Sequence, residues 1–397
     1  MELEIAFQQI LNLNELIVTS VTMSETRIDI ECCSAFEEAI CPSCLKKQKS
    51  VNQTYTREVR DLAISEKKVF LHITERQFYC SDCDRYFMER FSFVDKNEHF
   101  TERYQKRIFQ QIKQCSISQV IVIEDICWKT ANAIFERQSD KQLIGNENFR
   151  QVKFIGLDEF SLKKGHKDFA TVVVDLERYS VITVLPYREK DKLVKYFQSK
   201  GKDWCSGVEL FCSDMWDGFV NMAKEVFPKA EITIDRFHFF KQVNQAVDNQ
   251  RKSLRKDFKE EEDLKNIKYL LLRNYDTLTK EQQNKLERAF QVAPVLKDIH
   301  SAKENLRKIF EQDIDKQQAT QKIDEWTENA KKLNNKYLNK FINTLNNWKA
   351  YILNYFCTRL TTSIIEGMNN KIKMIKRMGF GFTNFANFRL RILAAFN

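Results

Sequence analysis

The chain has 397 residues, with 43% hydrophobic and 30% charged residues and a net charge of +9 at pH 7. This composition supports packed cores in about two to four domains and excludes a largely disordered chain. No apolar run reaches the roughly 18 residues of a membrane span, and the first residues lack a secretory signal pattern, so we expect a cytoplasmic protein with no membrane partner. The basic excess fits either a solvated surface or a polyanionic partner, and the stretch from Lys371 to Asn397 holds six basic residues and no acid.

Two Cys-x-x-Cys pairs stand out in residues 1–97, Cys41 with Cys44 and Cys80 with Cys83. Strands are predicted between them at 57–62 and 68–79, and short alternating stretches before residue 40 also suggest strands. Four thiolates at this doubled spacing predict a zinc ribbon-like domain, residues 1–97, with one structural Zn²⁺. The alternatives are four unrelated buried cysteines or a redox pair, for which no βαβ context is visible. We expect the other seven of the eleven cysteines to be reduced thiols.

Three helices are predicted between residues 101 and 138. The first spans 101–113, the second opens with a capping-box sequence from Ser116 to Gln119, and the third spans 130–137 after a turn near 127–129. These proportions predict a helix-turn-helix, residues 98–140, whose third helix reads DNA, although an ordinary helical linker domain is the alternative. The candidate DNA-contacting residues are Lys129, Thr130, Asn132 and Arg137. A polar linker is predicted at 140–150.

Residues 150–238 show the element order of an α/β core. The predicted elements are strands near 152–157, 169–175 and 179–185, a helix near 189–199, a strand near 208–212, a helix near 215–227 and a strand at 231–234. This order predicts a ribonuclease H-like core. Asp158 and Asp214 follow the first and fourth strands, at the edge where open α/β sheets place ligand sites. Asp217 is the alternative to Asp214, and Glu159 is expected on the opposite face of its strand from Asp158.

Long helices are predicted to interrupt this core at residues 239–355. The stretch is rich in Lys, Glu, Gln, Asn and Leu, and its apolar positions are too irregular for a sustained coiled coil. The core resumes at 356–397, where an amphipathic helix spans 363–377. Its apolar face is predicted to contain Ile364, Met368, Ile372 and Ile375, and its polar face Glu366, Asn370, Lys373 and Arg377.

Three separated carboxylates, Asp158, Asp214 and Glu366, provide oxygen ligands that suit hard divalent cations in phosphoryl transfer. We therefore expect Mg²⁺ or Mn²⁺ as cofactor, beside the structural Zn²⁺. An alternative remains for Glu366, because Ser363 and Glu366 also fit a capping box that closes a helix N-terminus.

Several motifs run in a fixed order through nearly the whole chain. They are Cys41-Pro-Ser-Cys44, Cys80-Ser-Asp-Cys83, Ile155-Gly-Leu-Asp-Glu-Phe160, Lys164-Gly-His166, Cys212-Ser-Asp-Met215, Ala230 to His238, Glu366 to Lys373, Lys376-Arg377 and Gly379-Phe-Gly381. With them the chain resembles the DDE transposases of bacterial insertion sequences, in particular the ISL-three family. The resemblance implies a zinc-binding domain, a helix-turn-helix and a ribonuclease H-like domain with a helical insertion before its glutamate. It also implies the catalytic triad Asp158, Asp214 and Glu366.

The predicted function is cleavage of the terminal inverted repeats of an insertion sequence and strand transfer into target DNA. A catalytically inactive DNA-binding regulator and a structure-specific nuclease are the alternatives. Double-stranded DNA is the expected partner, and a homodimer or higher oligomer is expected on DNA because two ends must be brought together. Near the active site the candidate DNA contacts are His238, Asn370, Lys373, Lys376 and Arg377.

Overall fold

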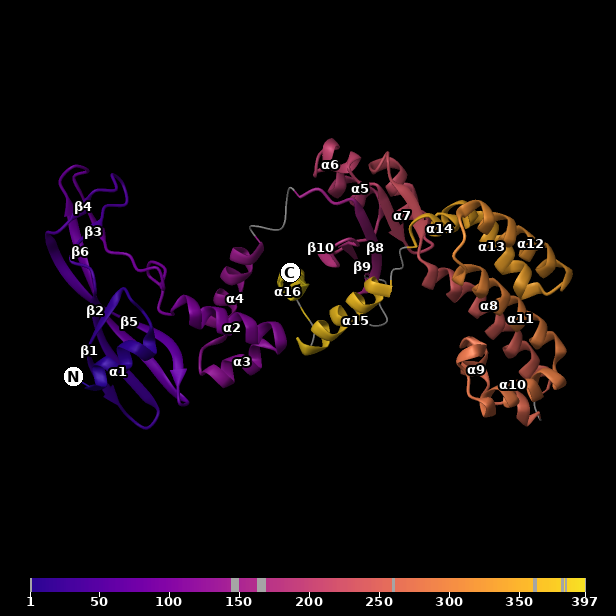
Figure 1. The fold of residues 1–397 in the computed structure, drawn as a ribbon, viewed down its shortest axis with the longest axis horizontal. Coiled ribbons are helices and arrows are strands. Elements are labelled where there is room, and N and C mark those ends of the chain that lie inside the picture. The colour runs from indigo at the N-terminus through magenta and orange to yellow at the C-terminus, as the bar shows by residue number, and fades with distance from the viewer. Residues whose placement is uncertain are drawn as a thin grey trace. The chain divides into compact units, whose positions relative to one another are not determined.

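A computed structural model describes residues 2–143, 150–162, 169–258, 261–359, 363–379, 382 and 384–396, and the chain divides into two compact units, residues 1–145 and 146–397 (Figure 1). Three stretches singled out in the sequence lie partly or wholly outside the described residues. They are the linker predicted at 140–150, the motif at 164–166 and the glycine-containing motif at 379–381.

The first unit is built on a five-stranded sheet with the order β1-β2-β6-β5 and with β7 paired to β6. Its elements are α1 (Glu2–Leu11), β1 (Leu16–Met23), β2 (Arg27–Ser34), β3 (Ala39–Ile40), β4 (Lys47–Gln48), β5 (Val51–Ile64), β6 (Lys67–Cys80) and β7 (Arg85–Met88). In β6 every second residue, Val69, Leu71 and Ile73, is fully buried, which is the period of a strand with one face on a core. β5 and β6 form a long antiparallel hairpin, and β6 ends at Cys80, the first cysteine of the second pair.

Three helices complete the first unit: α2 (Glu102–Gln114), α3 (Ile117–Glu124) and α4 (Trp128–Leu143). The predicted capping box at the start of α3 is confirmed, because Ser116 and Gln119 bond each other's backbone N–H groups. Two neighbouring residues of β5 fasten the helices to the sheet. The guanidinium of Arg60 donates to the Glu124 carbonyl at 2.6 Å, and Asp61 accepts a hydrogen bond of 2.7 Å from the Thr101 hydroxyl.

The second unit contains a five-stranded mixed sheet with the order β10-β9-β8-β11-β12. Its strands are β8 (Phe154–Ser161), β9 (Phe169–Asp175), β10 (Ser180–Leu185), β11 (Leu210–Ser213) and β12 (Glu231–Ile234). β8, β9 and β10 are antiparallel neighbours, whereas β11 runs parallel to both β8 and β12. The associated helices are α5 (Lys190–Gln198), α6 (Lys202–Ser206), α7 (Asp217–Val226), α15 (Ser363–Met378) and α16 (Phe385–Phe396).

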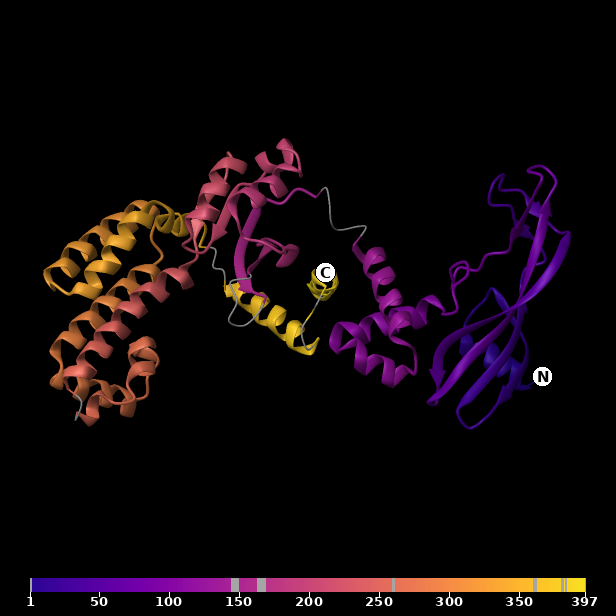
Figure 2. The ribbon, with the colours of Figure 1, turned by 180° about the vertical axis from the view of Figure 1, so that it is seen from behind.

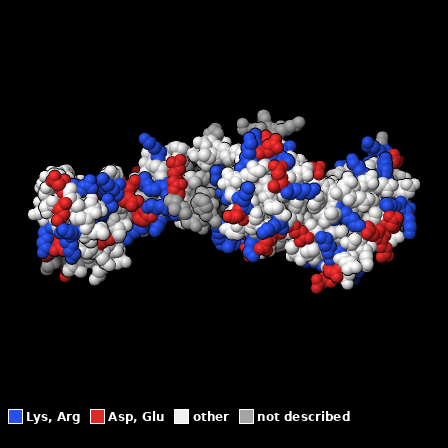
Figure 3. Space-filling view, turned by 90° about the horizontal axis from the view of Figure 1, so that it is seen from above, with Lys and Arg blue, Asp and Glu red and all other residues white. Residues whose placement is uncertain are grey.

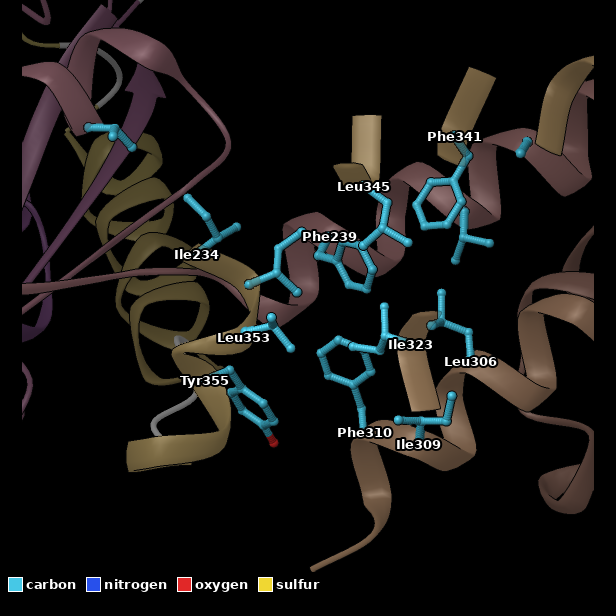
Figure 4. Close-up of a cluster of buried hydrophobic side chains, with 14 of the residues drawn as sticks. Ile234, Phe239, Leu306, Ile309, Phe310, Ile323, Phe341, Leu345, Leu353 and Tyr355 are labelled. Carbon is cyan, nitrogen blue, oxygen red and sulfur yellow. The ribbon is translucent and has the colours of Figure 1, made fainter. Parts of the chain in front are cut away.

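A helical insertion leaves this sheet after β12 and returns before α15, and Figure 2 shows the same arrangement from behind. Its elements are α8 (Arg236–Asp257), η1 (Glu262–Leu264), α9 (Lys268–Leu272), η2 (Tyr275–Thr277), α10 (Lys280–Val292), α11 (Pro294–Glu311), α12 (Lys316–Lys332), α13 (Lys336–Leu353) and α14 (Tyr355–Thr358). Phe239 of α8 packs 5.2 Å from Phe310 and 5.5 Å from Phe341 between ring centroids (Figure 4). The buried side chains form one cluster that continues from the sheet into the insertion.

The structure corrects several expectations from the sequence. The chain begins with a helix, α1, where only strands were suggested, and α6 and α16 were not predicted. The strand before Asp158 does not end there, since β8 continues to Ser161. The third helix of the first unit extends beyond 130–137 at both ends. Of the helices in the described ranges, none is long and apolar enough to cross a membrane.

Candidate active site and zinc centre

Three aspartates occupy the same level on neighbouring strands of the second unit. Cys212 of β11 pairs with Gly156 of β8 and with Thr233 of β12. Two residues beyond these paired positions are Asp158, which lies within β8, and Asp214 and Asp235, which directly follow β11 and β12. Because β8, β11 and β12 are parallel, their carboxyl-end residues meet at one edge of the sheet, as in ligand sites of open α/β folds.

Asp158 is half-buried and its two carboxylate oxygens have separate donors. Oδ1 accepts the backbone N–H of Glu159 at 2.7 Å, and Oδ2 accepts the side-chain amide of Asn369 at 2.6 Å. Burial raises the pKa of Asp158, and the negative charge of Asp235 adds to that effect, while His238 acts in the opposite direction. Both hydrogen-bond donors of Asp158 are neutral, so they orient its carboxylate without cancelling its negative charge.

Asp214 follows β11 and is the most strongly perturbed carboxyl group of the site. Burial, followed by the charges of Asp158 and Glu159, raises the pKa of Asp214 to about 7. Its Oδ1 is buried and has no hydrogen-bond partner among the described residues, while Oδ2 lies 3.9 Å from Nδ1 of His238. Crowded, partly desolvated carboxylates of this kind suit a divalent cation, whose charge would offset their mutual repulsion.

Glu366 lies on α15, the helix that packs against β8. A Cβ on Gly156 would lie 2.5 Å from Cδ1 of Ile365, so the missing side chain allows the close approach of the helix. Glu366 is the next residue after Ile365 and is exposed. In the part of the chain that the structure describes, Asp158, Asp214 and Glu366 do not form a group with ligand atoms all within 4.8 Å.

The neighbouring acids that the sequence left open have distinct positions. Asp217, the alternative to Asp214, is exposed in the first turn of α7. Glu159 binds the guanidinium of Arg188 at 2.8 Å, and that guanidinium lies over the Trp216 and Phe169 rings. Asp235 is buried and caps α8 by accepting the Phe237 N–H at 2.9 Å.

The candidate DNA contacts of the first unit differ in their surroundings. Lys129 is exposed at the start of α4, while the hydroxyl of Thr130 lies 3.1 Å from the Cys127 thiol. Asn132 donates to Glu136 at 2.8 Å. Arg137 forms an ion pair of 2.7 Å with Glu98 and also binds Gln105, which favours a role inside the unit for Arg137 over DNA contact.

The candidate contacts of the second unit lie mainly on the outer side of α15. Asn370, Lys373 and Arg377 are exposed, Lys376 donates to the Ser161 carbonyl at 3.1 Å, and His238 is half-buried. Basic and acidic side chains are interspersed on the face seen in Figure 3. Charge on that face therefore does not by itself mark a DNA-binding surface.

Sequence reasoning missed Asn369, which the structure places in contact with Asp158. The buried side of α15 consists of Ile365, Met368, Ile372 and Ile375, and Asn369 lies among them with 6% exposure. The side chain of Ile364, which the sequence assigned to the apolar face, lies outside the described residues. A polar residue on the apolar face of a helix was the available signal.

The four predicted zinc ligands of the first unit come together. The sulfur atoms of Cys41, Cys44, Cys80 and Cys83 all lie within 4.8 Å of one another, and two of the separations are 3.9 and 3.5 Å. Tetrahedral Zn²⁺ with bonds of about 2.3 Å requires sulfur atoms about 3.8 Å apart, so the cluster fits this ion. Backbone N–H groups, first that of Cys44, lower the pKa of Cys41 to about 6, which favours the thiolate that binds metal.

A second group of potential ligands in this unit is already neutralised. Asp29, Glu58 and His72 lie close together, but the Arg27 guanidinium binds Asp29 at 2.6 Å and Glu58 at 2.7 Å. The guanidinium thus supplies the positive charge that a metal ion would otherwise bring.

Comparisons with known proteins agree with this geometry. A family model described as a transposase, for the ISL-three group of DDE enzymes, matches residues 155–392, and a model described as the zinc-finger of transposase IS204/IS1001/IS1096/IS1165 matches residues 37–83. The first match covers more than half of the chain and includes the acid-bearing sheet edge, which defines a DNA transposase. The chain belongs to the ISL-three family of DDE transposases.

Two curated relatives extend the match beyond the domains. The chain is 28% identical over 362 residues to the transposase for insertion sequence element IS1001 of Bordetella parapertussis, covering 90% of this chain and 88% of the relative. It is 24% identical to the transposase for insertion sequence element IS1557 of Mycobacterium tuberculosis, covering 68% of this chain and 65% of the relative. The family resemblance read from the sequence motifs is therefore confirmed.

Proposed function

We propose that this transposase cuts DNA at the ends of its own insertion sequence and joins the ends to target DNA at the Asp158–Asp214 edge of the second unit. The observation that carries the proposal is that Asp158 and Asp214 lie two residues beyond the paired Gly156 and Cys212 of β8 and β11, and that burial, followed by the charge of Asp158, raises the pKa of Asp214 to about 7. Glu366, on the helix packed against β8, is the proposed third acid. The strand order β10-β9-β8-β11-β12 supports a ribonuclease H-like core.

The carboxylates of Asp158, Asp214 and Glu366 would hold divalent cations, Mg²⁺ or Mn²⁺. When bound, such cations neutralise charge on a phosphodiester and activate water or a DNA 3′-hydroxyl for attack. The chain's own contribution is to fix the acids: Asn369 and the Glu159 N–H orient Asp158, and β11 delivers Asp214 beside it. Arg188 is bound to Glu159 and lies over the Phe169 and Trp216 rings.

DNA recognition is assigned to the first unit. The Cys41–Cys44–Cys80–Cys83 cluster would bind a structural Zn²⁺, and α2, α3 and α4 would act as a helix-turn-helix on the terminal inverted repeats. Both relatives are named as transposases for insertion sequence elements, which supports repeat ends as the substrate. The exposed Asn370, Lys373 and Arg377 of α15 would contact the DNA backbone beside the acids. Synapsis of two ends implies a homodimer or higher oligomer on DNA.

The test is single-turnover cleavage and joining of a duplex that carries the element's own end. Asp158→Ala, Asp214→Ala and Glu366→Ala should each lower the cleavage rate by about 10²–10³-fold or more while repeat binding persists, because each removes charge-stabilising ligand oxygens. Asp217→Ala is the matched control and should keep measurable activity, since Asp217 is exposed on α7.

The outcomes separate the alternatives. Near-normal rates for Glu366→Ala would assign that residue to helix capping, and Asp235 would become the first candidate for the third acid. Cleavage without joining would indicate a structure-specific nuclease. Repeat binding without any cleavage in the unaltered protein would indicate a DNA-binding regulator.

A further inference from the structure

Asn369 and Ile365 lie one turn apart on α15 and contact β8 at two successive points. Ile365 packs where Gly156 has no side chain, and two residues further along the strand the Asn369 amide donates to Oδ2 of Asp158 at 2.6 Å. Both helix residues are at least nine-tenths buried, with exposures of 1% and 6%. The hydrogen bond is thus made inside a packed contact, where few rotamers of either side chain are available.

The chemical identity of the donor is informative. Asp158 receives its hydrogen bonds from an amide side chain and a backbone N–H, and neither carries a positive charge. A lysine or arginine donor would bring a positive charge, which would offset the charge that attracts a cation. Asn369 fixes the carboxylate plane and leaves the negative charge available.

Two oxygen atoms at this place are left without protein donors. Oδ1 of Asn369 and Oδ1 of Asp214 are both buried and have no hydrogen-bond partner among the described residues. Buried acceptors are almost always satisfied in folded proteins, so such atoms point to something that binds there in the working state.

We propose that Asn369 is a positioning residue that orients the Asp158 carboxylate for a divalent cation and couples α15 to the active site. This inference rests on the proposed function, in which Asp158 is a cation ligand. It concerns a residue three positions after Glu366, so one helix would supply both an acid and the amide that orients another acid. Partners of this kind typically change metal affinity or activity by about 10- to 100-fold.

The experiment is a Mn²⁺ titration of the full-length protein without DNA, in which the shift of the thermal unfolding midpoint is measured at each Mn²⁺ concentration. Asn369→Leu, nearly isosteric but without the amide, should raise the Mn²⁺ concentration for a half-maximal shift by about 10- to 100-fold. The Mn²⁺ dependence of the single-turnover cleavage rate should be displaced to higher concentration by the same factor. The cleavage rate should recover at high Mn²⁺. Asn369→Ala provides a second variant with a smaller side chain.

Asn335→Leu is the matched control. Asn335 is 7% exposed and donates its side-chain amide to Gln250 at 2.8 Å in the helical insertion. Its loss should lower the unfolding midpoint without moving the Mn²⁺ dependence, which is the result expected of a merely structural asparagine.

Unchanged Mn²⁺ curves for both Asn369 variants would overturn the positioning role, and so would failure of both variants to fold. Asp158→Ala in the same titration separates this result from the proposed function. If Asp158→Ala abolishes the Mn²⁺ shift while both Asn369 variants show it at the same Mn²⁺ concentration as the unaltered protein, only the positioning role is wrong. If Asp158→Ala changes neither the shift nor cleavage, the proposed function fails, and the positioning role fails with it.

Discussion

Gly156 shows how one residue without a side chain sets the approach of a helix to the active-site strand. Gly156→Ala would place a Cβ 2.5 Å from Ile365 Cδ1 and 2.8 Å from Leu176 Cδ2, and both neighbours are buried. We expect the free energy of unfolding to fall by about 1–3 kcal/mol, as in other overpacked cores. Cleavage should fall as well, because α15 carries Glu366 and Asn369. Chemical denaturation and single-turnover cleavage measure the two effects.

Two further variants make this prediction specific. Ile365→Val removes the clashing methyl group, so it should restore part of the stability on the Gly156→Ala background. Gly367 lies inside α15, and a Cβ there would meet no atom of a neighbouring described residue within 4 Å, so Gly367→Ala should stabilise the protein by about 0.5–1 kcal/mol. Equal effects of the two glycine substitutions would contradict the packing argument.

At the scale of elements, the hydrophobic core around the four cysteines is too small to hold its segments folded alone, so a bound Zn²⁺ is expected to supply the missing stability. The apolar residues buried around it are few, chiefly Ala39, Phe78 and Phe87 beside the cysteines. Cys80→Ser should therefore abolish zinc binding and unfold the segments around β3, β4 and β7, because site formation and folding are coupled. Elemental analysis and hydrogen exchange would detect both changes.

The matched control is Cys33→Ser, which changes a free cysteine of β2 outside the cluster. We expect that variant to keep one zinc per chain and normal exchange at 39–48 and 78–88. Purified protein without zinc, in either its unaltered or its Cys33→Ser form, would contradict the assignment.

The helical insertion contains a buried histidine that makes its stability depend on pH. Burial, and then the charge of Lys303, lowers the pKa of His300 to about 4, whereas an unfolded histidine titrates near 6.5. As pH falls from about 6.5 toward 4, the unfolded chain takes up a proton that the folded chain does not, so stability is lost. His300→Leu should lose less stability than the unaltered protein between pH 7.5 and 4.5, by about 2 kcal/mol.

Urea denaturation at several pH values measures this difference. Phe290→Leu is the control, because it alters the ring packed 5.3 Å from His300 without removing a titrating group. Its stability should be lower by a similar amount at every pH. Parallel pH profiles for His300→Leu and the unaltered protein would refute the prediction.

Periodicity predicted most of the sheet of the second unit and failed at both ends of the chain. β9 was expected at 169–175 and is found there, because its apolar run is almost wholly buried and fits only a strand. In α1, Leu3, Ile5 and Phe7 alternate like a strand, yet Leu3 and Ile5 are exposed and the helical pair Phe7 and Leu11 is buried. Tertiary packing, which a single sequence does not contain, decided between the two periods.

Only part of the candidate site could be predicted from the sequence, for a related reason. Asp158 and Asp214 each come directly after an apolar run, and equivalent positions of neighbouring parallel strands lie side by side. Their approach was therefore predictable, although β8 continues past Asp158 to Ser161. The contact of Asn369 depends on the rotation of α15 about its axis. Asn370, rather than Asn369, was expected on the polar face of this helix, and a shift of one residue turns a helix by about 100°.

For the whole molecule, the division into residues 1–145 and 146–397 separates the proposed recognition of DNA from the proposed chemistry. Within the first unit the helices and the sheet form one folded body, because Arg60 and Asp61 of β5 bind the helical segment at Glu124, Thr101 and Arg103. A fragment limited to residues 98–140 would lose these partners. The sheet that contains β5 and the three helices should therefore fold together.

We expect a fragment of residues 1–145 to fold cooperatively and to bind a repeat-end duplex in preference to a scrambled duplex of equal length. Its affinity should fall linearly with salt on logarithmic axes, because basic side chains displace counterions from phosphates. Lys129→Ala, at an exposed position of α4, should weaken repeat binding, whereas Lys106→Ala on α2 serves as a matched lysine control with a smaller effect. Fluorescence anisotropy at several salt concentrations measures the binding of the two duplexes and the effects of the two lysine variants. A folded fragment that binds both duplexes equally would remove recognition from this unit, and the basic face of α15 would then be the next surface to test.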